Sequence, residues 1–320
     1  MTSTLEVIVA RKIEEASGIC SFELISATGG ALPRFTAGAH VDVNLGDGLC
    51  RQYSLCNNPL ETHRYLIGVL LEPMSRGGSR AMHDRVREGD RLTISTPRNL
   101  FEIDRAGRQF LLFAGGIGVT PILAMAEALA QKGGDFTMHY CGRSLEHMAF
   151  VERLGRSAFA KQVHVHVDNG PASQRFDAGA ILAAASVDAH LYVCGPAGFI
   201  EAVTTRARQA GFPEAQIHVE HFAAQSTIVE GDTGFDIVLA RSSKVIHVGP
   251  DESAVEALSR NGIEIETSCE QGICGTCMTA VLEGVPEHRD MYLSQAERDA
   301  NNVFLPCCSR ALGGRLVIDR

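Results

Sequence analysis

Short apolar runs, separated by glycine, proline and aspartate, are spread along the first third of the chain. They occupy residues 5–10, 20–24, 40–43, 65–71 and 91–94. Short strands at such regular spacing, with turn-forming residues between them, are typical of a β-barrel or a β-sandwich. We therefore predict that residues 1–104 form an antiparallel β-barrel.

The pattern changes after residue 104, where apolar strands alternate with helical stretches. An Ala- and Leu-rich helix ends near residue 132, and the predicted strands lie at residues 109–114, 136–141, 162–167 and 190–194. Strands that alternate with helices form βαβ units, which build a parallel sheet. We predict an α/β domain of this kind over residues 105–225, followed by a polar linker over residues 226–235.

The last part of the chain mixes both patterns. A helix is predicted at residues 253–260, with Ser253 as its N-cap, and a short one at residues 294–300. The predicted strands lie at residues 236–240, 244–248, 279–282, 303–307 and 315–318. We expect residues 236–320 to form a separate α+β domain.

Composition limits the classes of protein to which the chain can belong. With 320 residues and 45% apolar content, it is long enough for two or three domains with full cores. No run of about 18 apolar residues is present, and the N-terminus lacks a charged segment followed by an apolar one, so we expect no membrane span and a cytoplasmic location. The net charge of −9 argues against a nucleic-acid partner.

The strongest chemical signal is a group of cysteines near the end of the chain. Cys269, Cys274 and Cys277 have the spacing C-x4-C-x2-C, and 29 residues separate Cys277 from Cys307. This is the plant-type ligand pattern of a [2Fe–2S] cluster. The glycines between the ligands allow the backbone to turn closely and to offer N–H groups to the sulfurs.

A zinc site or a disulfide framework fits these cysteines less well. A zinc site usually has two C-x2-C pairs or histidine ligands, and a disulfide framework suits a small secreted chain. Free cysteines that cluster by chance are the remaining alternative. Cys308 is a rival to Cys307 as the fourth ligand, and we favour Cys307 because only one of two adjacent strand residues can face the cluster.

Two segments of the predicted barrel suit a phosphorylated ligand. Arg51, Tyr53 and Ser54 lie close together in the first, and Ser79 and Arg80 follow two glycines in the second. A glycine-rich turn followed by serine and arginine can bind an anion through N–H groups and a guanidinium. Each segment alone is a weak signal, because R-x-Y-S is common by chance and the serine also suits a plain helix N-cap.

Two glycine-containing loops follow strands of the predicted α/β domain. Residues 115–121 read GGIGVTP, and residues 194–198 read CGPAG. Ligands of open α/β sheets bind at the carboxyl ends of the strands, so these loops suit a dinucleotide, and tight turns needed only for packing are the alternative. Asp168 follows another strand, where it suits a ribose hydroxyl or, somewhat better, a simple turn.

In this order the motifs make the chain resemble the phthalate dioxygenase reductase family, which serves Rieske-type oxygenases, over almost its whole length. The matching segments are RQYSLCN at 51–57, RGGSR at 76–80, GGIGVTP at 115–121, CGP at 194–196, HVEHF at 218–222, the cysteine loop, and HRDMYLS at 288–294. The resemblance implies an FMN-binding barrel, an NADH-binding α/β domain and a plant-type ferredoxin domain with the β-grasp fold.

The resemblance also implies site residues. The FMN phosphate would be bound by Arg51, Ser79 and Arg80, and the isoalloxazine would contact Tyr53 and Ser54. The nicotinamide site would be shaped by Gly116, Thr120, Cys194, Gly195 and Pro196. Phe222 would lie near the flavin ring, with a core aromatic at a domain end as an equal alternative. The iron ligands would be Cys269, Cys274, Cys277 and Cys307.

The implied function is an NADH-dependent reductase that passes single electrons to a separate terminal oxygenase. Nicotinamide gives two electrons as a hydride and a [2Fe–2S] cluster takes one at a time, so a flavin must stand between them. A self-contained oxygenase would need a Rieske Cys/His pair or a 2-His-1-carboxylate pattern, which we do not find. A non-Rieske acceptor, or a non-catalytic sensor of the nicotinamide pool, remains the alternative.

Two details concern specificity. Asp168 would repel the 2′-phosphate of NADPH, Arg143 and Ser144 would welcome it, and the resemblance favours NADH. Residues 236–320 carry 13 Asp and Glu against 8 Lys and Arg, a net charge of −5. Five of these acids flank the cysteine loop: Glu264, Glu266, Glu270, Glu283 and Glu287. A docking face for a basic partner and an ordinary solvated surface account for these acids equally well.

Overall fold

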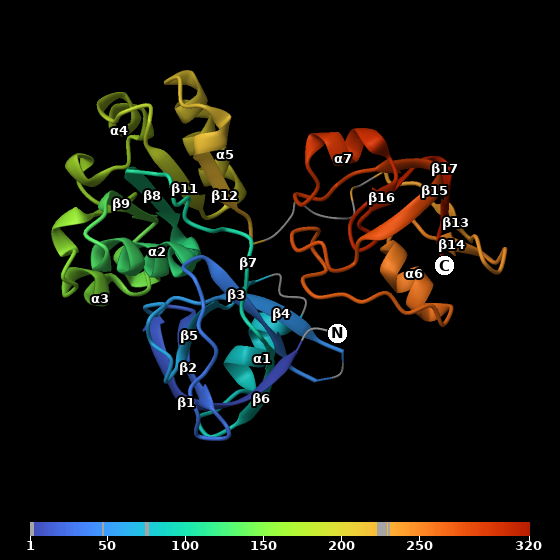
Figure 1. The fold of residues 1–320 in the computed structure, drawn as a ribbon, viewed down its shortest axis with the longest axis horizontal. Helices are drawn as coiled ribbons and strands as arrows, with labels where there is room; N and C mark the ends of the chain where they lie inside the picture. Colours follow the sequence, from blue (N-terminus) through green and yellow to red (C-terminus); the bar gives the residue numbers. More distant parts are fainter. Residues whose placement is uncertain (1–2, 47, 74–76, 223–228, 230) are drawn as a thin grey trace. The chain divides into compact units, whose positions relative to one another are not determined.

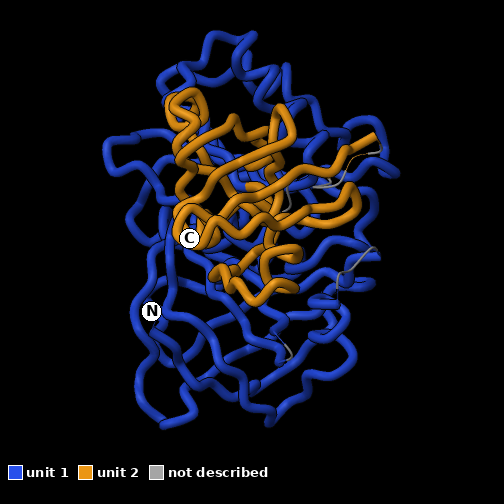
Figure 2. Tube along the Cα trace, turned by 90° about the vertical axis from the view of Figure 1, so that its right-hand side faces the viewer, with its two compact units in different colours: residues 1–220 blue, residues 221–320 orange. Residues whose placement is uncertain are grey.

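The computed structural model describes residues 3–46, 48–73, 77–222, 229 and 231–320. It divides into two compact units, residues 1–220 and residues 221–320 (Figure 2). Arg76, in the second segment of the predicted phosphate site, lies outside the described residues. No helix in the described part of the chain is both long and apolar enough to cross a bilayer.

The first unit begins with an antiparallel sheet in the strand order β4-β3-β6-β1-β2-β5, with β7 paired to β3 (Figure 1). Leu55, directly after β4, bridges Ile67 of β5 in antiparallel sense, so the two ends of the sheet meet and form a barrel. Its elements are β1 (Thr4–Ala16), β2 (Ile19–Ser26), β3 (Ala39–Asn44), β4 (Cys50–Ser54), β5 (Tyr65–Leu70), α1 (Gly78–Asp84), β6 (Arg91–Ser95) and β7 (Arg98–Asn99).

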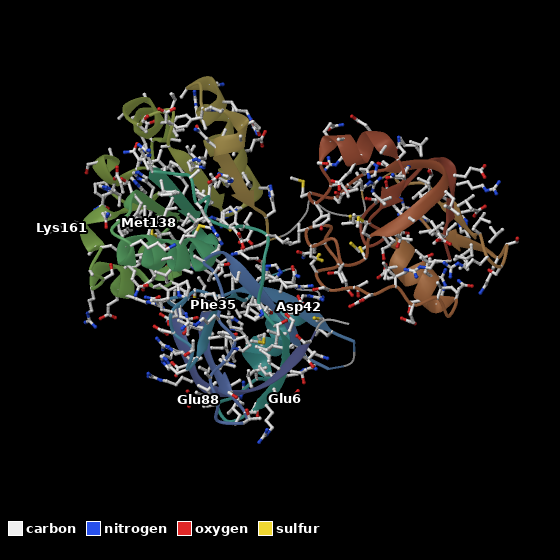
Figure 3. The ribbon with its side chains drawn as sticks, viewed as in Figure 1. Glu6, Phe35, Asp42, Glu88, Met138 and Lys161 are labelled. Atoms are coloured by element: carbon white, nitrogen blue, oxygen red, sulfur yellow. The ribbon has the colours of Figure 1, made fainter. Side chains whose placement is uncertain are left out.

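Alternation of side chains explains why these residues form a barrel. Val7 and Val9 of β1 are fully buried, and their neighbours in sequence are half-buried or exposed. Phe22 and Leu24 of β2 are fully buried as well, with half-buried Glu23 between them. Phe35, labelled in Figure 3, packs into the same core. β1 continues well beyond the predicted apolar run, because its polar second half still pairs with β2 as far as Ala16.

The rest of the first unit is a parallel sheet in the order β10-β9-β8-β11-β12. Its strands are β8 (Gln109–Gly115), β9 (Asp135–Gly142), β10 (Val163–Val167), β11 (His190–Cys194) and β12 (Ile217–Glu220). Its helices are α2 (Val119–Gln131), α3 (Val151–Gly155), α4 (Ala178–Ala184) and α5 (Ala197–Gln209). Short 3-10 turns occupy Gly116–Gly118, Leu145–His147, Ala160–Gln162, Ala172–Gln174 and Glu214–Gln216. The prediction of a parallel α/β layer is confirmed. β12, a short strand of two apolar and two polar residues, was not predicted.

The order of the strands creates a switch point in this sheet. From β8 the chain builds outward to β9 and β10, and it then returns to the other side of β8 with β11 and β12. Leu111 and Phe113 of β8 pack with Leu182 of α4 and Ile200 of α5. A crevice outside the carboxyl ends of β8 and β11 is therefore expected, since the connections leave these two strands in opposite directions.

The second unit is a mixed sheet in the order β14-β13-β17-β15-β16, with only β13 and β17 parallel (Figure 1). Its elements are β13 (Phe235–Leu239), β14 (Val245–Val248), α6 (Ala254–Arg260), β15 (Thr279–Glu287), α7 (Gln295–Ala300), β16 (Val303–Phe304) and β17 (Arg310–Ile318). Ser253 caps α6 as predicted, in a capping box with Glu256. Ala257 and Leu258 of α6 pack on the sheet, which gives the α+β arrangement of a β-grasp domain.

Candidate functional site

Two loops meet at the switch point of the parallel sheet. A Cβ atom added to Gly118 would lie 2.3 Å from the carbonyl oxygen of Cys194, and one added to Gly195 would lie 2.9 Å from the Cα of Gly115. These glycines therefore serve close contact of one backbone with another, and Gly116 adds a positive φ of 53°. The structure brings the two predicted nicotinamide loops together at the edge where a dinucleotide binds in this class of sheet.

The side chains of these loops are fixed by burial and hydrogen bonding, and none of them is chemically reactive. Thr120, which is buried, donates a hydrogen bond from its hydroxyl to the carbonyl oxygen of Ile117 at 3.1 Å. Cys194 is fully buried, and burial raises the pKa of its thiol well above the usual value, with the carboxylate of Glu220 adding to the shift. A neutral, buried thiol is a poor nucleophile, so Cys194 is suited to shaping the site.

Glu220 is a site residue that the sequence analysis missed. It pairs with Cys194 across β11 and β12, and its side chain is hydrogen-bonded to that of Ser54 in the barrel. Burial raises the pKa of its carboxyl group to about 8, while the bond with Ser54 lowers it. Among the described residues its Oε2 has no hydrogen-bond partner. Its place in the HVEHF segment, which was matched only as a motif, was the available signal.

The contact between Ser54 and Glu220 joins the barrel to the nucleotide layer at the predicted flavin ring. Tyr53, next to Ser54, is largely buried, and burial raises the pKa of its phenol. Its hydroxyl also lacks a hydrogen-bond partner within the described part of the chain. Buried polar atoms are normally paired, so these orphaned atoms fit a site that a polar ring system completes.

The predicted phosphate residues also come together. A Cβ atom on Gly78 would lie 2.3 Å from Cγ of Arg51, so the absence of a side chain there lets the arginine stem lie against the start of α1. Ser79 is not the N-cap of α1, which is Gly77, and its hydroxyl instead accepts a hydrogen bond from the backbone of Glu72 at 3.1 Å. Arg80 is exposed on the same turn. This set fits a phosphate.

Asp168 lies at the carboxyl end of the edge strand β10, exposed and within a turn closed by a hydrogen bond from Gly170 to Val167. The backbone N–H of its neighbour Asn169 donates to the carbonyl oxygen of Arg143 at 3.2 Å. Asp168, which would repel the 2′-phosphate of NADPH, and Arg143, which would bind it, therefore lie on adjacent loops. The turn interpretation and a ribose contact are compatible with this position.

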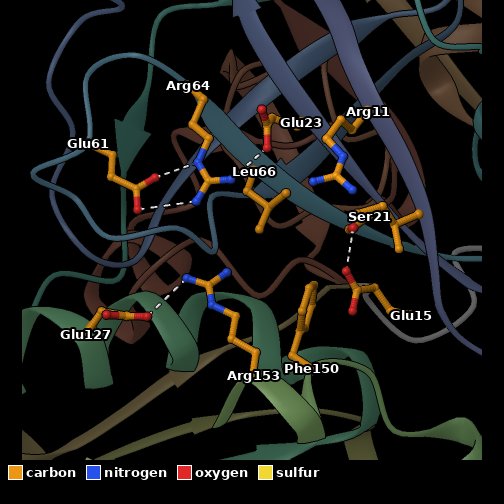
Figure 4. A pocket seen from close by; sticks show the side chains of 11 residues that line it. Arg11, Glu15, Ser21, Glu23, Glu61, Arg64, Leu66, Glu127, Phe150 and Arg153 are labelled. Carbon is orange, nitrogen blue, oxygen red and sulfur yellow. Dashed lines mark hydrogen bonds and ion pairs between the residues drawn. The ribbon is translucent and has the colours of Figure 1, made fainter. Parts of the chain in front are cut away.

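A cleft of about 400 Å³ lies between the barrel and the nucleotide layer (Figure 4). Arg64 bonds to Glu23 and Glu61 on one wall, and Arg153 bonds to Glu127 on the other. Phe150 lines the cleft with φ of 61°, and its ring contacts the position where Gly68 would carry a Cβ. The same position lies 2.8 Å from Cγ2 of Thr120, so this wall also supports the nicotinamide loop.

In the second unit, the four cysteine thiols that were predicted as ligands meet in two pairs. The thiol of Cys269 lies against that of Cys274, and the thiol of Cys307 lies against that of Cys277, with Cys308 next to Cys307. In the described residues no three His, Cys, Asp or Glu side chains converge as a single metal centre would require. Two thiol pairs suit two irons, each with two protein ligands.

The loop around these thiols is shaped for sulfur. The amide of Gln271 donates to Sγ of Cys269 at 3.3 Å, as N–H groups do around Fe–S centres. Gly272 and Gly275 have φ values of 71° and 73°. A Cβ atom on Gly275 would lie 2.3 Å from the ring of Tyr292. The residues present therefore fit a [2Fe–2S] cluster.

The expectation that Cys307 and Cys308 lie in a strand was wrong, because both residues lie in a turn between β16 and β17. β16 ends early, at Phe304, and Pro306 cannot donate a ladder hydrogen bond. Strand alternation therefore does not decide between the two cysteines. The positions of the thiols still differ. The thiol of Cys307 contacts those of Cys277 and Cys308. The thiol of Cys308 contacts Cys307 but not Cys277, and it lies 3.6 Å from the carbonyl oxygen of Leu305 and next to Gly272.

Phe222, at the start of the second unit, is half-buried. Its predicted contact with a flavin ring stays a prediction.

Two known protein families match separate parts of the chain. Residues 237–312 match the family described as 2Fe-2S iron-sulfur cluster binding domain. Residues 93–217 match the family described as dimethylamine monooxygenase subunit DmmA-like, N-terminal domain.

Similar proteins match over nearly the full length of the chain. Vanillate O-demethylase oxidoreductase of Pseudomonas putida is 50% identical, over 98% of this chain and 99% of its own. The carnitine monooxygenase reductase subunit of Escherichia coli (strain K12) is 41% identical, over 93% and 92%. The solved structure of phthalate dioxygenase reductase, described as modular for electron transfer from pyridine nucleotides to [2Fe-2S], is 35% identical with a TM-score of 0.81, over 99% and 98%.

Proposed function

The chain belongs to the phthalate dioxygenase reductase family, and from this membership we propose that it passes single electrons from NADH, through FMN and a [2Fe–2S] cluster, to a Rieske-type oxygenase. It is an NADH-dependent oxidoreductase, the reductase component of an oxygenase system, and it uses a flavin and a [2Fe–2S] cluster. FMN, the Rieske type of the acceptor and the individual site residues are the proposed parts.

The observation that carries the proposal is that one chain combines a site suited to a flavin and a nucleotide with a group of cysteine thiols suited to an iron–sulfur cluster. The first unit joins a barrel to a nucleotide layer through Ser54 and Glu220, and the second presents two thiol pairs. A bound flavin accepts a hydride and releases electrons singly, which matches a two-electron donor to a one-electron acceptor.

The protein's own groups position and protect this exchange. The touching loops at Gly118 and Gly195 seat the nicotinamide, and Thr120 and Cys194 shape its pocket without reacting. Glu220 holds a proton on its buried carboxyl group at neutral pH, because its pKa is about 8. It can therefore donate a hydrogen bond to a ring system that lies against Ser54.

We assign the iron ligands as Cys269 with Cys274 on one iron and Cys277 with Cys307 on the other. The pairing of thiols and the amide donated by Gln271 support this assignment. We assign FMN rather than FAD because Arg51, Ser79 and Arg80 form a charged set suited to a terminal phosphate. FAD on extraction of the bound flavin would contradict that choice.

The oxygenase is proposed to dock at the cluster loop. Exposed Glu264 and Glu266 lie in the segment that leads to Cys269, and Met291 and Tyr292 are half exposed beside Gly272 and Gly275. An acidic rim steers a basic partner, while apolar side chains near the thiols suit close contact.

Mixing the purified protein with NADH and a Rieske oxygenase tests the proposal. We expect the visible spectrum of the Rieske centre to bleach only when all three are present. If the protein instead oxidises NADH but reduces no Rieske oxygenase, although it reduces cytochrome c, the acceptor belongs to another class.

A further inference from the structure

We propose that Lys12 is a positioning residue for the flavin phosphate, acting through the C-terminal end of α1. The inference rests on the proposed FMN site, and it concerns a residue far from the motifs that define that site. Lys12 lies on β1, half-buried, in a stretch that the sequence pattern marks only as polar.

The ammonium group of Lys12 reaches across to the end of α1. Its Nζ donates to the carbonyl oxygens of Met82, His83 and Val86, at 3.2, 2.5 and 2.9 Å. It also lies 5.3 Å from the centre of the Phe22 ring. The last carbonyls of a helix have no partner within the helix, and Lys12 bonds three of the groups that α1 and its exit leave open. The guanidinium of Arg87 also donates to His83 and Val86, at 3.2 Å each, but Arg87 lies on the segment that follows α1 and does not connect the helix to β1.

Contacts with the barrel core and with β5 also hold this end of the helix. Met82 is fully buried in the barrel core, and Nε2 of His83 lies 2.9 Å from the carbonyl oxygen of Val69 on β5. Within the described residues, Lys12 is the side chain that ties this end to β1. The other end carries Ser79 and Arg80, and it cannot move separately in a helix of seven residues.

The position of α1 matters because the phosphate set is assembled from two elements. Arg51 comes from β4, and its stem lies against Gly78 with no room for a Cβ atom. A small shift of α1 along the barrel separates Ser79 and Arg80 from Arg51. Groups that bind one anion together must hold their geometry to a fraction of an ångström, so the shift weakens phosphate binding.

A comparison of FMN with riboflavin tests the inference, because riboflavin has the same ring without the phosphate. The flavin is removed, and the dissociation constants of both ligands are measured by flavin fluorescence for wild type, Lys12→Met, Lys12→Gln and Lys12→Arg. We expect Lys12→Met and Lys12→Gln to raise the dissociation constant of FMN about tenfold, the size expected if the shift of α1 breaks one charge-assisted hydrogen bond to the phosphate. The dissociation constant of riboflavin should not change, and Lys12→Arg should restore much of the affinity for FMN.

Arg11→Met is the matched control, since Arg11 precedes Lys12 on β1 and lines the cleft of Figure 4. It should leave both constants unchanged. If Lys12→Gln raised the dissociation constants of FMN and riboflavin equally, Lys12 would be a general stabiliser of the barrel and the inference would be overturned. No change in either dissociation constant would overturn it as well. Wild-type protein that binds FMN no more tightly than riboflavin would contradict the phosphate site itself.

Discussion

Glu220 joins the barrel and the nucleotide layer through a single buried carboxyl group, bonded to Ser54 and adjacent in the sheet to Cys194. An exposed glutamate releases its proton near pH 4.3, but this one does so only near pH 8. A buried carboxyl group with a raised pKa destabilises the folded protein once the pH exceeds the pKa that the group has in the unfolded chain. The dependence of stability on pH is therefore a test of this one residue.

We expect Glu220→Gln to flatten the dependence of stability on pH. Between about pH 4.5 and pH 8 the folded protein keeps a proton that the unfolded chain has released, so rising pH favours unfolding of wild type. The resulting decrease in the free energy of unfolding is on the order of a few kcal/mol, and it is complete above pH 8. Melting temperatures at pH 5 and pH 8.5 measure it, with Glu201→Gln, on the exposed side of α5, as the control. Parallel curves for wild type and Glu220→Gln would refute the raised pKa.

The two adjacent cysteines give a second test at this scale. Cys307→Ser should abolish the visible absorption of the cluster, because its thiol meets that of Cys277. Cys308→Ser should leave that spectrum intact, because its thiol lies at the carbonyl of Leu305. The opposite pattern would assign the fourth ligand to Cys308.

Single residues also mark the limit of what the sequence predicts. The cysteine spacing and the phosphate motifs were evident because the chemistry needs those residue types in that order. Lys12 carries no such signal, and Glu220 has only its place in the HVEHF segment. Each acts through a partner from a distant part of the chain, and only the fold brings Ser54 to Glu220 and the end of α1 to Lys12.

At the scale of elements, the two loops after β8 and β11 depend on backbone contact. Gly118→Ala would place a methyl group 2.3 Å from the carbonyl oxygen of Cys194, and the loops would have to separate. We expect kcat/KM for NADH to fall at least about tenfold, because misplacement of a reactant by an ångström is costly. Gly155→Ala, at a position with open space at the end of α3 and outside both loops, is the control and should change little. If kcat/KM for NADH were the same in both variants, the two loops would not form the nicotinamide site.

The types of element were largely predictable, and their lengths were not. Alternation and βαβ order predicted the barrel and the parallel sheet. β12 was missed because it has only four residues, two of them polar, and all four are only partly buried. β15 and β17 extend past their apolar runs, since Val285 to Glu287 pair with Arg310 to Leu312 regardless of side-chain polarity. Strand pairing decided these boundaries.

At the scale of the whole molecule, the reductase must deliver its electrons to another protein. We expect the rate of electron transfer to its oxygenase to fall as salt is added, because the acidic rim attracts a basic partner. The double substitution Glu264→Gln/Glu266→Gln should flatten that slope, and Glu201→Gln should not. A flat response of wild type, or an unchanged slope in the double variant, would leave these two residues as ordinary surface.

The central claim is that electrons from NADH pass through the flavin before they reach the cluster, and the most direct test is Cys274→Ser in rapid mixing without oxygen. Each unit has its own core, so this change should destroy the cluster and spare the first unit. NADH should bleach the flavin of wild type and variant at similar rates, while reduction of cytochrome c falls sharply in the variant alone. Cytochrome c reduction by Cys274→Ser at the wild-type rate would contradict the account.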